Sequence, residues 1–222
     1  MNTSEASTRW FPRLPGTRTT AAWAMVAAGT LWIAHGYFLF MMPYGPDALW
    51  REDLGYMTIL SPGLFLLYGL PGVLAVLLTA WGLRSCLPAL VPAGALNRAA
   101  RILGLAALVF GVIAALGLII QFTPLTIGGI SFGLPALGLA LFLAGLALGR
   151  ASEGFGAGPG FLRAVLIVTG CLGMATLLVR PMIYALGLLP PVSGTAVLAL
   201  IGVAWVSLGI SMRQATASSP AR

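Results

Sequence analysis

Six apolar stretches, each about 20 residues long or longer, occupy most of this 222-residue sequence. They cover about 21–42, 58–82, 101–122, 127–149, 163–187 and 194–212. Since an α-helix rises about 1.5 Å per residue, each stretch can cross a hydrocarbon core about 30 Å thick. Backbone groups in lipid must be hydrogen-bonded within their own segment, and the alternating pattern of a transmembrane barrel is absent. The sequence therefore predicts an all-α, polytopic transmembrane helical bundle of six helices in three hairpins.

The composition excludes a water-soluble domain of this size. Hydrophobic residues make up 59% of the chain and charged residues 8%, whereas soluble domains carry about a quarter charged residues. The first apolar stretch is too long for the apolar region of a signal peptide, so we expect it to be retained as a span. We predict a six-helix transmembrane domain over 21–212, with a cytosolic N-terminal tail over 1–20 and a cytosolic C-terminal tail over 213–222.

The basic residues, all of them arginines, give the expected orientation. Most of the arginines lie in four segments that fall on one side of the membrane: the two tails and the second and fourth connections. These arginines are Arg9, Arg13, Arg18, Arg84, Arg98, Arg101, Arg150, Arg163, Arg213 and Arg222. The loops on the other side hold only Arg51. Positive charge marks the cytosolic side, so both termini should be cytosolic and no nucleic-acid partner is needed to explain the charge. Basicity from arginine alone, together with abundant Ala, Gly and Leu, is typical of GC-rich bacterial coding and indicates a bacterial plasma membrane.

The first outer loop, about 43–57, concentrates the charges of the opposite side. It holds Asp47, Arg51, Glu52 and Asp53. Asp47 suits a helix N-cap, and the apolar residues that follow can lie on the membrane surface. We expect a short interfacial helix here.

Small residues spaced four apart predict close helix packing. Such pairs or triplets occur in three of the spans: Ala107, Gly111 and Ala115; Gly129 and Gly133; Gly145 and Gly149. Small residues let helix backbones approach each other in lipid, where no hydrophobic effect drives association. These faces could build a compact bundle, or they could join a second copy or a partner membrane subunit.

Arg180 and His35 are titratable residues within apolar spans, where a charge is costly. Each lies 17 residues after the arginine that begins its span, so the two should reach similar depth in the outer leaflet. One interpretation is an outward-facing polar pocket, with Tyr37, Gln121 and Tyr184 as further lining residues. The other is structural: Arg180 can snorkel to the headgroups or pair with a loop acid, and His35 can bond a neighbouring backbone.

Catalytic and metal-binding motifs are few. Residues 129–133 match the G-x-S-x-G pattern, and Ser131 could meet His35 at the same depth, but no strand precedes the pattern. A single histidine and two distant cysteines make neither a zinc site nor a bis-histidine haem site, so no metal or cofactor is expected. The spans contain no Asp or Glu, which argues against a proton-driven transporter.

These observations favour a non-enzymatic accessory or scaffold membrane protein, surrounded by the lipid bilayer. Two alternatives stay open. The chain could be a small-solute or lipid transporter with a pocket around Arg180 and His35, or an intramembrane serine hydrolase that uses Ser131 and His35.

Overall fold

The computed structural model describes residues 17–42, 48–51, 56–91, 93–152 and 160–217. Its helices are α1 (Thr17–Phe40), α2 (Pro62–Leu90), α3 (Ala95–Ile119), α4 (Thr123–Ser152), α5 (Gly160–Tyr184) and α6 (Pro191–Ala217). All six are long and apolar enough to cross a membrane. The predicted all-α, polytopic class is confirmed, and each helix coincides with one of the six apolar stretches.

The prediction of a short interfacial helix in the first outer loop is wrong for the part of that loop that the structure describes. Ala48–Arg51 forms strand β1, which pairs antiparallel with β2 (Tyr56–Ile59), so that Ala48 lies opposite Ile59. Residues 56–59 are Tyr, Met, Thr and Ile, mostly types that favour strands, and they give 48–51 a partner for its backbone hydrogen bonds. A helix this short would have to nucleate without tertiary support. Asp47, Glu52 and Asp53 lie outside the described residues.

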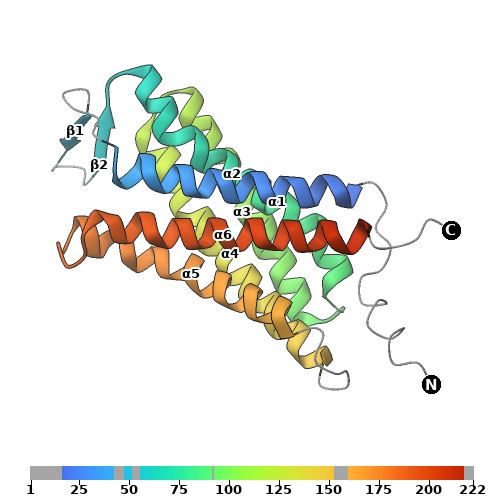
Figure 1. The fold of residues 1–222 in the computed structure, drawn as a ribbon. Helices are drawn as coiled ribbons and strands as arrows, with labels where there is room; N and C mark the ends of the chain where they lie inside the picture. Colours follow the sequence, from blue (N-terminus) through green and yellow to red (C-terminus); the bar gives the residue numbers. More distant parts are fainter. Residues whose placement is uncertain (1–16, 43–47, 52–55, 92, 153–159, 218–222) are drawn as a thin grey trace, which may run out of the picture.

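Each of the six helices runs opposite to the helix before it in the sequence, so the connections alternate between two ends of the bundle (Figure 1). The end that carries β1 and β2 also carries the turns at Gln121 and Gly187; we call it the hairpin end. The other end, where α1 begins and α6 ends, carries Arg84, Arg98, Arg101 and Arg163; we call it the arginine end.

Helices α1 and α6 pack with their backbones in contact, although they lie farthest apart in the sequence (Figure 1). A Cβ on Gly209 would lie 2.7 Å from the Ala22 carbonyl oxygen, and one on Gly29 would lie 2.8 Å from the Val206 nitrogen. Small residues face each other at intervals of seven along both helices, in three pairs: Ala22 with Gly209, Gly29 with Gly202, and Gly36 with Thr195. Seven residues make two helical turns, so one continuous face holds the two helices together.

The small residues that the sequence analysis selected all lie inside the bundle of one chain. Gly111 and Gly133 contact Val76 of α2, Gly129 packs on α3, and Gly145 and Gly149 pack on α5. The expected compact packing is therefore observed, and this chain's own helices occupy these faces.

We predict that Gly202→Ala weakens the bundle. The added methyl would meet the α1 backbone at Gly29 and lie 2.6 Å from Ile33 Cγ1, so the two helices must separate. Such overpacking costs about 1–3 kcal/mol, which should appear as a lower unfolding temperature in detergent. Gly128→Ala is the matched control, because a Cβ there meets nothing within 4 Å. Equal melting of the two variants would contradict the α1–α6 interface.

Candidate functional site

A cavity of about 300 Å³ lies between α1, α4, α5 and α6, in the half of the bundle nearer the hairpin end. Most of its wall is apolar, and its polar side chains are few: His35, Ser131, Thr176 and Arg180, with the indole of Trp32. Arg180 lies four residues before the end of α5 and Thr176 eight, so these two polar residues lie about 6 and 12 Å from the helix end.

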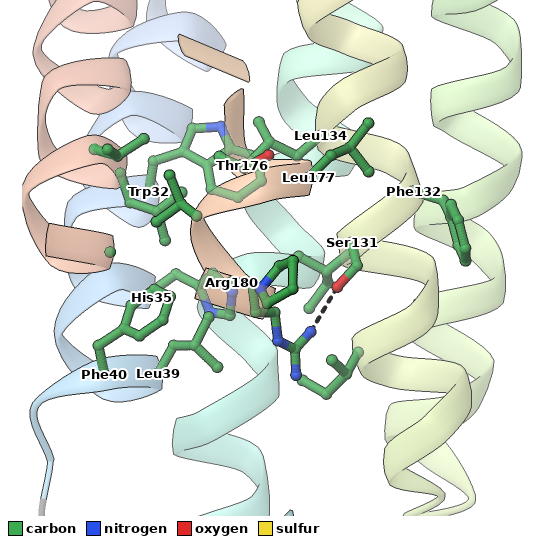
Figure 2. Close-up of a pocket in the computed structure, with 17 residues that line it drawn as sticks. Trp32, His35, Leu39, Phe40, Ser131, Phe132, Leu134, Thr176, Leu177 and Arg180 are labelled. Atoms are coloured by element: carbon green, nitrogen blue, oxygen red, sulfur yellow. Dashed lines mark hydrogen bonds between the residues drawn. The ribbon is translucent and has the colours of Figure 1, made fainter. Parts of the chain in front are cut away.

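Arg180 brings a positive charge into this cavity. Its Nη1 donates a hydrogen bond of 2.6 Å to Ser131 Oγ, which joins α5 to α4. In Figure 2 the guanidinium lies between His35 and Ser131. All the acidic residues of the chain fall outside the described residues, so within the described part no carboxylate balances this charge.

His35 is 1% exposed and lines the same cavity from α1. Its imidazole lies against Gly72 of α2, where a Cβ would approach within 2.7 Å of the ring. The ring has a hydrogen bond to the Tyr68 backbone and an edge contact with Trp32 at a centroid distance of 6.0 Å. Its Nδ1 is buried and has no hydrogen-bond partner among the described residues. His35 therefore combines a structural bond with one unused nitrogen.

The deeper wall of the cavity is fixed by a buried bond between α1 and α2. Trp32 Nε1 donates to Thr79 Oγ1 at 3.1 Å, and both residues are fully buried. Thr176 hydrogen-bonds the Gly173 carbonyl of its own helix. The sequence analysis missed Trp32 and Thr176, although they lie three residues before His35 and four before Arg180, on the same helical faces.

Two of the proposed pocket residues lie elsewhere. Tyr37 is half exposed and packs edge-on against Phe38, with ring centroids 5.6 Å apart. Gln121 is exposed in the α3–α4 turn, where it adopts a positive φ of 56°. Neither lines the cavity. The Tyr184 side chain lies outside what the structure describes.

Ser131 is not arranged as a catalytic nucleophile. It lies within α4, not on a strained turn between a strand and a helix. Its hydroxyl accepts the bond from Arg180, and the described structure shows no hydrogen bond between Ser131 and His35. A serine nucleophile needs an adjacent base, whereas this one is paired with a cation.

The cavity opens to the side of the bundle. Phe132 on α4 and Leu177 on α5 line it and are 59% and 50% exposed. On the α6 side its wall includes Gly194 and Leu198. Because exposed side chains of spanning helices face lipid, the cavity is accessible from within the membrane.

Comparison with known proteins gives this site no precedent: no family model, no curated protein and no solved structure matches the chain.

We predict that Thr79→Val destabilises the protein although it changes little in shape. The valine leaves the Trp32 N–H buried without an acceptor, which costs about 1–3 kcal/mol. Thr30→Val is the control, because exposed Thr30 bonds only the Val26 carbonyl of its own helix. Thermal unfolding in detergent should show a clear decrease for Thr79→Val and little change for Thr30→Val. The reverse order would mean that the bond between Trp32 and Thr79 does not support the cavity wall.

Proposed function

We propose that this multi-pass membrane protein binds an anionic, lipid-like molecule in the cavity beside Arg180, without catalysing a reaction on it. The observation that carries the proposal is the Arg180 guanidinium in a mostly apolar cavity, where it donates one hydrogen bond, to Ser131. An arginine at the centre of a spanning helix costs about 2.5 to 3.5 kcal/mol on insertion scales, the cost is smaller toward the helix ends, and arginines within spans usually mark a binding site or pathway.

The shape of the cavity supports an amphiphilic ligand. Its volume of about 300 Å³ is at the lower end for small-molecule pockets, which suits a head group with part of one chain. Only one of the Arg180 nitrogens is bonded to Ser131, so the planar guanidinium retains donors for a carboxylate or phosphate. The apolar wall and the exposed rim of Phe132 and Leu177 suit an acyl chain that continues into the bilayer.

The depth of Arg180 agrees with a ligand that enters from one leaflet. Arg180 lies about 6 Å from the end of α5, so it is closer to one membrane surface than to the midplane. An amphiphile that moves sideways from the bilayer can place its acidic group there while its chain stays in lipid. The unused Nδ1 of His35 can accept a hydrogen bond from a hydroxyl or amine of the head group, while Arg180 binds its acidic oxygens.

We further propose that the protein lies in a bacterial plasma membrane with both termini in the cytosol, so that the cavity opens in the outer leaflet. Support comes from the arginines: Arg84, Arg98, Arg101 and Arg163 all lie at the end of the bundle where α1 begins and α6 ends.

A fluorescent protein that matures only in the cytosol, fused to either terminus, should therefore fluoresce. A dark fusion that is nevertheless expressed at full length would reverse the orientation.

We predict that Arg180→Gln lowers affinity for a long-chain fatty acid by at least tenfold. Glutamine is still polar but removes the charge that binds the carboxylate. The purified protein in detergent would be titrated with a fluorescent fatty acid, and with the corresponding fatty alcohol as an uncharged probe. The wild type should prefer the acid, and Arg180→Gln should lose that preference.

Arg163→Gln is the matched control for this experiment. Arg163 is an exposed arginine at the opposite end of the same helix, so its loss should leave binding unchanged. If wild type and Arg180→Gln bind the acid equally, or if the wild type binds neither probe, the cavity is not an acidic-lipid site.

A further inference from the structure

Arg84 of α2 and Arg101 of α3 are exposed arginines near the arginine end of two helices that pack against each other. The stem of Arg84 crosses to α3, where its Cγ is 3.5 Å from the position of a Cβ on Gly104. Arg101 precedes Gly104 by three residues, which places it one turn nearer the arginine end on the same helical face. Two neighbouring helices therefore bring two guanidinium groups to one patch of surface.

The two arginines lie at the same depth. Arg84 is six residues before the end of α2 and Arg101 six residues after the start of α3, so both lie about 9 Å from the helix ends. Both are exposed, and exposed Trp81 lies one turn deeper on α2. Tryptophan is enriched where the hydrocarbon core meets the head groups, so the guanidinium groups lie at head-group level.

The charge at this patch is unbalanced within the described residues. Exposed Arg98 adds a third positive charge one turn before Arg101, and the first turn of α3 has no acidic residue. The N-terminal end of a helix is itself partly positive, so arginines there are unfavourable unless an anion is near. At head-group level the most abundant anion is the phosphate of a phospholipid.

We propose that Arg84 and Arg101 form a binding site for the phosphate of an anionic phospholipid, in the leaflet opposite the cavity. The two guanidinium groups approach the phosphate from neighbouring helices, Arg98 adds attraction, and Trp81 packs beside the upper acyl chains. Arg163 lies over Gly149 at the end of α4 and so belongs to a different pair of helices. The site requires neither the cavity nor the orientation proposed above.

The experiment uses the full-length chain, purified in a non-ionic detergent and delipidated. Its unfolding temperature would be measured with added phosphatidylglycerol, with phosphatidylcholine of the same chain length, and with inorganic phosphate. We expect phosphatidylglycerol to raise the unfolding temperature by several degrees and the other two additives to have little effect. An equal rise with phosphatidylcholine would overturn the proposal. An equal rise with inorganic phosphate would show that the site binds a free anion and not a lipid.

The double variant Arg84→Gln/Arg101→Gln should lose the specific rise, whereas Arg163→Gln should keep it. Without lipid the double variant should melt at or above the wild-type temperature, because like charges have been removed. A double variant that retains the full rise would exclude this pair as the site. If the double variant does not fold, native mass spectrometry of the wild type decides: one retained phosphatidylglycerol supports the site, and none overturns it.

Discussion

Packing of helix backbones against each other in lipid is the constraint on which the whole structure depends. The hydrophobic effect acts little between helices that lipid already surrounds, so close van der Waals contact must hold them together. Small residues at intervals of seven bring α1 against α6, and Gly138 meets Gly170 where α4 crosses α5. These contacts fix helices from both ends of the sequence around one space, and the cavity is what their side chains leave unfilled.

This packing also places Arg180, a residue that is costly in lipid, beside a polar partner in the cavity. The arginine is held by Ser131 from a neighbouring helix, and the buried bond between Trp32 and Thr79 supports the wall beneath it. Ser131 accepts a hydrogen bond from only one nitrogen of the guanidinium, which is the basis for the proposal that the others bind a ligand. At the opposite end, Arg84 and Arg101 have the same need for an anion but lie on the outer surface, so the anion there belongs to the membrane itself.

The sequence predicted some features of the site better than others, for identifiable reasons. His35 and Arg180 were selected as titratable residues within apolar spans, their equal distances from Arg18 and Arg163 predicted similar depth, and the cavity contains both. Tyr37 and Gln121 do not line it, because Tyr37 faces outward from α1 and Gln121 lies in the exposed α3–α4 turn, and neither outcome can be read from a residue's place along its span. The helix expected in the outer loop was wrong because strand pairing with residues 56–59 is a contact between segments, which local capping signals do not reveal.

The sequence by itself determined that the protein lies in lipid, how many spans it has, and that successive spans run in opposite directions. Hydrophobic length and the cost of unsatisfied backbone groups are properties of each segment alone. It also determined that the arginines would gather at one end, since that follows from their place between spans. Only the tertiary structure decided which helices touch, which face of each one lines the cavity, and that Ser131 bonds Arg180 and not His35. Those outcomes depend on rotation about each helix axis, and that rotation is set by the fit of small residues on distant helices.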